Sequence, residues 1–121
     1  MSAVLSFAHR GVPCAIPAAQ ATAVDVRVAP DAQAALWDGE ALAHGRAIAA
    51  QTEDGTIWVG CADPRIVDLV EGDVLALSPL LRRILGSLPH VVGLSMLEGR
   101  ATWLVDLSRY RRGPVGEPSE R

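Results

Sequence analysis

The feature that most constrains the fold of this chain is a repeated pattern, in which apolar runs of four to seven residues alternate with tight turns that contain glycine. In the C-terminal half, one pair of runs flanks Glu53-Asp54-Gly55 and another flanks Glu98-Gly99-Arg100. Glycine adopts a positive φ at low cost, so each pair predicts a β-hairpin. The sequence shows no repeating alternation of strands and helices, which is the pattern expected of a parallel sheet. The pattern therefore predicts a mainly β fold of the barrel-like or sandwich-like kind.

The N-terminal part predicts further strands. Residues 3–8 and 12–16 form two short apolar runs with a glycine-containing break between them, which is typical of a hairpin. The stretch from Val24 to Val28 alternates apolar and charged residues. This period of two predicts a half-buried strand whose residues Val24, Val26 and Val28 face the core.

Two local signals divide the region that follows the first C-terminal hairpin. Asp63-Pro64 is expected to end the returning strand of that hairpin, and Ile66 is expected to begin the next strand. Ser78, with Pro79 after it and Gly86 as a stop signal, predicts a short helix. Near the C-terminus, Asp106 is expected to cap the turn of residues 108–112. Residues 113–121 are predicted to form a disordered tail.

Composition narrows the class of function. The chain has 121 residues, of which 50% are apolar and 21% charged, as in one globular domain, and its net charge of −3 makes a nucleic-acid partner improbable. Cys14 and Cys61 lack the spacing of a zinc site, and His9, His44 and His90 show no metal or nucleophile spacing. No cofactor is expected. With no signal peptide and no apolar run of membrane length, we expect a cytoplasmic protein without membrane insertion.

An ordered set of motifs then gives a resemblance. The motifs are Val59-Gly60-Cys61-Ala62-Asp63, Val91-Val92-Gly93-Leu94 and the stretch from Trp103 to Tyr110. In this order they resemble the second lobe of the CheW-like adaptor family of bacterial chemosensory systems. Residues 12–17 resemble, more faintly, the opening hairpin of that family. The resemblance covers about residues 3–28 and 46–110.

The resemblance implies a fold of two small SH3-like β-barrel lobes with one or two short helices. It implies one CheW-like domain over residues 1–112, with a first lobe at about 1–45 and a second at about 46–112. The family carries a strand pair and a Pro-Val-x-Asp-Leu motif in its first lobe, and residues 28–46 leave little room for them. The chain thus resembles a shortened, divergent member with a truncated first lobe. It is similar to the small CheW-like type of the myxobacterial Frz system.

The function implied by the resemblance is non-enzymatic coupling. Family members link the cytoplasmic tips of methyl-accepting receptors to a CheA-type histidine kinase. The missing segment predicts that kinase binding is weak or absent here, and other CheW-like proteins are further candidate partners. The receptor-binding positions that we expect from the resemblance and from strand placement are Ile16, Pro17, Val24, Val26, Val59 and Gly60.

Several alternatives stay open at this point. Trp58 and Trp103 either anchor a partner from an exposed face or pack inside the fold. Gly60 and Asp63 fit a close backbone approach and a turn better than a binding role. The chain could instead be a structural module that dimerises through exposed strand edges. A small enzyme, built from residues distant in sequence, is the less favoured third alternative.

Overall fold

The computed structural model describes residues 2–29, 32–37, 45–70, 74–76, 78–84 and 88–110. The fold is mainly β, as predicted, and its described helices are short. The strands are β1 (Ser2–His9), β2 (Val12–Pro17), β3 (Ala21–Arg27), β4 (Arg46–Thr52), β5 (Gly55–Gly60), β6 (Ala62–Leu69), β7 (Val74–Ala76), β8 (Val91–Leu97) and β9 (Arg100–Val105). The helices are the 3₁₀ turns η1 (Ala18–Gln20) and η4 (Leu107–Arg109) and the α-helix α1 (Pro79–Ile84).

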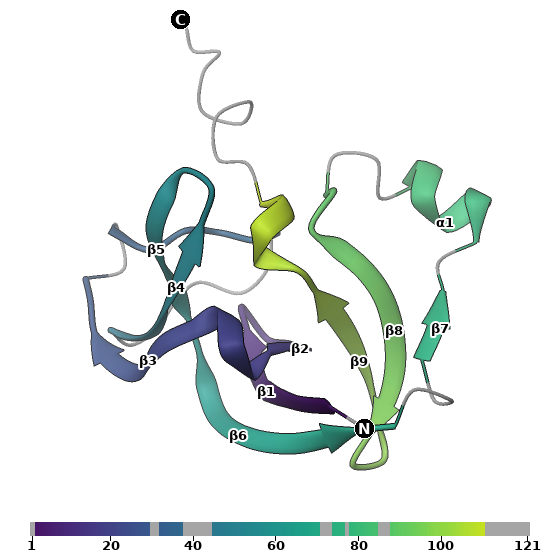
Figure 1. Ribbon diagram of the computed structural model, residues 1–121, viewed down its shortest axis with the longest axis horizontal. Coiled ribbons are helices and arrows are strands. Elements are labelled where there is room, and N and C mark those ends of the chain that lie inside the picture. The colour runs from purple at the N-terminus through teal and green to yellow at the C-terminus, as the bar shows by residue number, and fades with distance from the viewer. Residues whose placement is uncertain are drawn as a thin grey trace, which may run out of the picture.

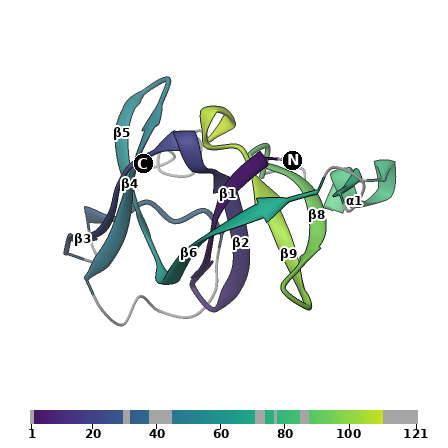
Figure 2. The ribbon, with the colours of Figure 1, turned by 60° about the horizontal axis from the view of Figure 1, so that its bottom comes forward.

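The described strands form two sheets. One sheet has the order β6-β1-β2-β9-β8-β7, and the other has the order β3-β4-β5. The pairing of β2 with β9 is parallel, and the other strand pairings are antiparallel. Figures 1 and 2 show the three-stranded sheet at one end of the molecule and α1 with β7 at the other. Strands from before and after residue 45 are therefore interleaved in both sheets.

The predicted hairpins are present, and their turns explain why they form. Arg10 and Gly11 join β1 to β2 with φ values of 53° and 83°. Glu98 and Gly99 join β8 to β9 with φ values of 51° and 79°. Positive φ at both central residues is the type I′ geometry, whose twist matches that of paired strands. These turns fix the register of the two hairpins.

The prediction that Asp63-Pro64 ends a strand is wrong. β6 begins at Ala62 and continues through both residues. Its pairing with β1 shifts between Ser6 and Ala8, and Asp63 has a φ of 53°, so the two strands meet in a β-bulge. Pro64 is tolerated because β6 is an edge strand, where a missing N–H breaks no second ladder.

The prediction that three valines of β3 and its flank face the core is also wrong. Val24 is 43% exposed, and Val26 and Val28 are only partly buried. The pairing of β3 with β4 has two register shifts, and Asp25 between the valines has a φ of 62°. Such irregularities break the strict period of two on which the prediction depended.

Two apolar clusters lie on opposite faces of the six-stranded sheet. The larger one is enclosed between that sheet and the three-stranded sheet and includes Phe7, Ile16, Ile48, Ile57 and Val105. The smaller one is built on Val4, Ala15, Leu97 and Leu104. Alternate residues of one strand reach the two clusters, as Ala15 and Ile16 of β2 do, because successive side chains point to opposite faces.

Helix α1 falls within the predicted range and starts at Pro79 as expected. Arg82 and Arg83 are exposed, and Leu80 is also exposed, to 65%. The predicted tail of residues 113–121 lies outside the described residues. Among the described residues, no helix has the length and apolar character that crossing a membrane would require.

Candidate functional site

The outward face of the three-stranded sheet is the most distinctive surface that the predicted positions reach. Trp58 lies on β5 opposite Ala49 of β4, and Ala49 lies opposite Ala23 of β3. Residues directly opposite each other share a face, so these three form one row. Gln51 and Thr56 flank the row, and the Thr56 hydroxyl donates a hydrogen bond to Gln51 Oε1 at 3.0 Å. We call these five residues the Trp58 face.

Trp58 is exposed because its neighbours in the strand are not. Ile57 and Val59 are 2% and 0% exposed and point into the larger core cluster, whereas Trp58 is 37% exposed. Of the two alternatives left open for Trp58, the structure therefore favours the exposed position. Its neighbours in the row, Ala23 and Ala49, carry only methyl side chains. A large, rigid aromatic ring on small neighbours is typical of the residues that dominate protein interfaces.

The six expected receptor-binding positions do not share one surface. Ile16, Val59 and Gly60 are buried, so they offer no side-chain area to a partner in this conformation. Pro17, Val24 and Val26 are exposed or partly exposed. Val24 and Val26 lie on β3, in the same sheet as the Trp58 face.

The second expected anchor, Trp103, has a different place. It is partly buried and packs against the larger core cluster from β9. Its cross-strand neighbours are Cys14 on β2 and Leu94 on β8. Trp103 is therefore mainly a packing residue, whereas Trp58 is available for contact.

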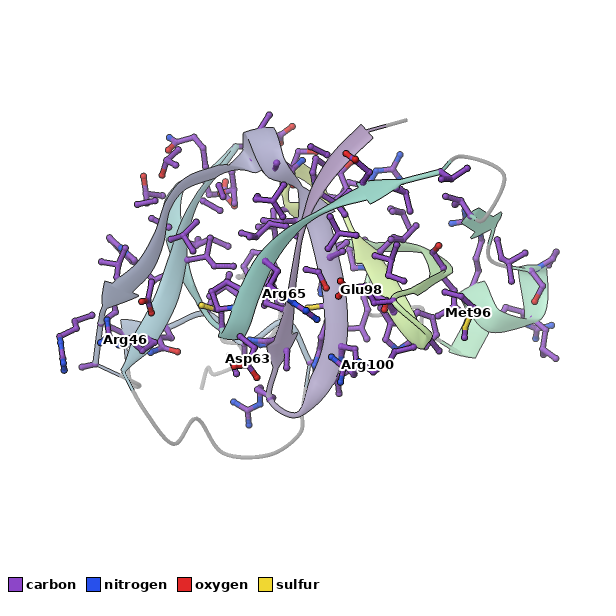
Figure 3. All side chains as sticks on the ribbon, turned by 90° about the horizontal axis from the view of Figure 1, so that it is seen from below. Arg46, Asp63, Arg65, Met96, Glu98 and Arg100 are labelled. Atoms are coloured by element: carbon purple, nitrogen blue, oxygen red, sulfur yellow. The ribbon has the colours of Figure 1, made fainter. Side chains whose placement is uncertain are left out.

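Charged side chains pair around the edges of the fold. Arg65 of β6 and Glu98 of the β8–β9 turn point toward each other in Figure 3, with 2.5 Å between nitrogen and oxygen. Arg46 of β4 lies 3.5 Å from the carboxylate of Asp25 on β3. Exposed pairs of this kind contribute little to stability, so their effect is to fix local geometry.

A polar network joins the two 3₁₀ turns. Gln20 of η1 donates through Nε2 to Asp106 Oδ1 at 2.7 Å and accepts at Oε1 from the Leu107 backbone N–H at 2.9 Å. The Asp106 carboxylate also accepts from the Ser108 backbone N–H at 3.0 Å, which confirms its predicted capping role. These hydrogen bonds to the charged form hold the pKa of Asp106 below its ordinary value, although its partial burial acts in the opposite direction.

The titratable groups of the interior are engaged in structure. Burial raises the pKa of both the Cys14 and the Cys61 thiol, which disfavours the reactive thiolate form of each. His9 and His90 are buried and bonded to backbone atoms. Sequence reasoning placed these histidines at turns and strand starts, but it missed that they converge. Within the described ranges, no group of three or more His, Cys, Asp and Glu residues is placed to hold a metal ion.

A second exposed apolar group lies at the far end of the molecule. Leu75, Leu80 and Met96 are 61%, 65% and 58% exposed, and they come from β7, α1 and β8. Figure 3 shows Met96 at the opposite side of the molecule from Arg46 on the three-stranded sheet. Comparison of the chain with family models, curated proteins and solved structures finds no match.

Proposed function

We propose that this protein is a non-enzymatic coupling adaptor of a bacterial chemosensory system that binds the cytoplasmic tip of methyl-accepting receptors. The observation that carries the proposal is the Trp58 face, where an exposed tryptophan stands on a sheet surface of small residues. An exposed aromatic anchor suits contact with another protein. The choice of partner follows from the motif resemblance in residues 46–110, which suggests a CheW-like adaptor of the cytoplasm.

The proposed fold within this class is a pair of small SH3-like lobes. Its support is the presence of two apolar clusters on opposite faces of the six-stranded sheet, each of which would be the interior of one lobe. The three quoted motifs lie at the β5–β6 junction, at the start of β8 and over β9 with η4. They thus fall on strands that border both clusters.

A receptor contact at the Trp58 face would use the helical form of the receptor tip. A helix laid on an apolar surface contacts it through residues spaced three and four apart. The exposed or partly exposed valines of β3, Val24 and Val26, extend the apolar area of the same sheet. Ile16, Val59 and Gly60 would support this surface from below and would not touch the partner.

The test is binding of the full chain to a receptor signalling-domain fragment, measured by calorimetry. We expect binding by the wild-type chain and a loss of about tenfold or more for Trp58→Ala, because an aromatic anchor at the centre of an interface is worth at least about 1.4 kcal/mol. The matched control is Leu75→Ala, which removes an exposed apolar side chain at the other end of the molecule. Absence of wild-type binding, or equal affinity of both variants, would reject the proposal.

Coupling to a CheA-type kinase is expected to be weak or absent, because the sequence of residues 28–46 leaves little room for the strand pair and motif of the family's first lobe. A reconstituted mixture of receptor, kinase and this chain should show little kinase activation. Full activation in that mixture would contradict this part of the proposal.

Homodimerisation through a strand edge is the second candidate, and the exposed edge of β6 bears on it. Ile66 on this edge is 64% exposed, which favours self-association. Pro64 and the adjacent bulge, together with the charged Arg65 and Asp68, oppose edge-to-edge pairing. Sedimentation velocity distinguishes the two functions, since the adaptor is expected to be monomeric.

A further inference from the structure

Residues 32–37 form a strap across the edge of β5 that β4 does not pair. The backbone N–H of Ala34 donates to Trp58 O at 2.7 Å, and Ala34 forms a parallel bridge with Val59. Leu36 is only 1% exposed and belongs to the larger core cluster. The strap therefore closes part of an open sheet edge and fills part of the core.

Two histidines from distant parts of the chain hold the backbone of Leu36. The Leu36 N–H donates to His9 Nε2 at 3.1 Å, and the Leu36 carbonyl accepts from His90 Nε2 at 2.7 Å. Trp37 adds a third tie, because its indole N–H donates to the His9 carbonyl at 3.1 Å. The Trp37 ring packs against both imidazoles, with centroid distances of 5.4 Å to His9 and 6.4 Å to His90.

These hydrogen bonds define which nitrogen carries the proton on each ring. His9 Nε2 accepts, so its proton is on Nδ1, which donates to Gly60 O at 2.8 Å. His90 donates from Nε2 to the Leu36 carbonyl, which leaves Nδ1 as the nitrogen that a second proton would occupy. That Nδ1 is buried and has no hydrogen-bond partner among the described residues. Both rings are therefore held in the neutral form.

A second proton on either ring is incompatible with the closed strap. On His9 it would occupy Nε2 and face the Leu36 N–H, so that two donors would oppose each other. On His90 it would occupy Nδ1, where no described residue provides an acceptor, and a buried donor without an acceptor is costly. Two imidazolium rings around one indole would also repel each other.

The described residues around the pair offer no compensating negative charge. Arg10, which follows His9, is a cation, and the buried thiol of Cys14 on the neighbouring strand is neutral. Tyr110 packs its ring against His90 at 5.3 Å. Asp106 contacts His90 through its backbone N–H, while its carboxylate is bonded to Gln20 and Ser108.

We propose that His9 and His90 form a proton-operated latch, which releases residues 32–37 from the edge of β5 when the surroundings become acidic. Release frees the carbonyl of Trp58 on that edge and empties the place of Leu36 in the core. The latch is independent of the identity of any partner. It would nonetheless change the shape of the strand that carries Trp58, and so any contact made there.

The size of the effect follows from the titration of His9. Burial lowers the pKa of His9 from 6.5 to about 4, and burial also lowers the pKa of His90. A group whose pKa is lowered in the closed state stabilises that state fully above 6.5 and loses this contribution as the pH falls toward 4. If release restores the ordinary value, His9 alone favours opening about 70-fold more at a pH of about 4.5 than at about 7.5.

The test is hydrogen exchange of the full chain at these two pH values, expressed as protection factors so that the intrinsic pH dependence is removed. We expect the amides of Ala34 and Leu36 to lose protection by about 50-fold or more at the lower pH, while those of β8 change much less. An unchanged strap, or an equal loss in β8, would overturn the proposal.

Variants then assign the effect to the histidines. His90→Gln keeps a donor for the Leu36 carbonyl but does not titrate, so the pH-dependent loss should shrink. The double variant H9Q/H90Q, if folded, should show no pH-dependent loss in the strap. His44→Gln, which alters the histidine outside the described residues, is the matched control and should behave as wild type. The assignment would be refuted if H9Q/H90Q or H90Q lost as much strap protection at low pH as the wild type does. It would also be refuted if H44Q showed no such loss.

Discussion

Truncation of Leu36 to alanine tests whether the strap is part of the core or only rests on it. The side chain is 1% exposed and packs within the larger cluster. Its removal creates a cavity while leaving the two backbone hydrogen bonds to His9 and His90 in place. Leucine-to-alanine changes at such sites cost about 3 kcal/mol, within a range of roughly 2–5 kcal/mol. We expect Leu36→Ala to lower the free energy of unfolding by that amount.

The assay is urea unfolding at neutral pH followed by circular dichroism, with the free energy of unfolding obtained by linear extrapolation. Leu75→Ala is the matched control, because Leu75 is 61% exposed and its truncation should cost less than about 0.5 kcal/mol. The denaturant dependence of the free energy should be unchanged in both variants. A cost below about 1 kcal/mol for Leu36→Ala, or one equal to that of Leu75→Ala, would show that the strap is not a core element.

Three further predictions concern the turns. Gln20→Ala removes the acceptor of the Leu107 N–H and a donor to Asp106, so it should cost about 1–3 kcal/mol, measured by thermal unfolding. Gly99→Ala meets no atom within 4 Å but must keep a φ of 79°, so a cost of roughly 1 kcal/mol should appear in urea unfolding. The pKa of Asp106 is lowered in the folded chain, so its carboxylate stabilises the fold above its ordinary pKa of 3.8, and this stabilisation is lost as the pH falls further. The difference between the unfolding midpoints at a pH of about 6 and about 3 should therefore be smaller in Asp106→Asn than in wild type.

Local signals were sufficient for the elements whose structure is decided by a few neighbouring residues. The hairpin turns at Arg10-Gly11 and Glu98-Gly99 depend on positive φ at two adjacent positions, which the sequence indicates directly. The start of α1 at Pro79 and the cap at Asp106 have the same local origin. The continuation of β6 through Pro64 was missed because a proline is tolerated or excluded according to the position of its strand in the sheet. That position depends on pairings far away in the chain.

The candidate site was predictable only in part, for the same reason. The exposure of Trp58 follows from its alternation with Ile57 and Val59 within one strand. The burial of Ile16 depends on a second sheet that the sequence did not place over it. The hydrogen bonds from Leu36 to His9 and to His90 join residues that are 27 and 54 positions apart in the sequence, and no periodicity or spacing predicts them.

The interleaved strand order has a consequence for the order in which the chain acquires its structure. The β1–β2 hairpin can form early, but β2 must wait for β9, since Cys14 pairs with Trp103 and Ala15 with Leu104. Closing a loop of that length costs conformational entropy before the favourable contacts between the two strands can form. Folds that are rich in such distant pairings therefore fold slowly. During synthesis the apolar hairpin therefore waits with one edge unpaired until almost the whole described chain has emerged. Its period of greatest exposure to aggregation is on the ribosome, before the fold is complete.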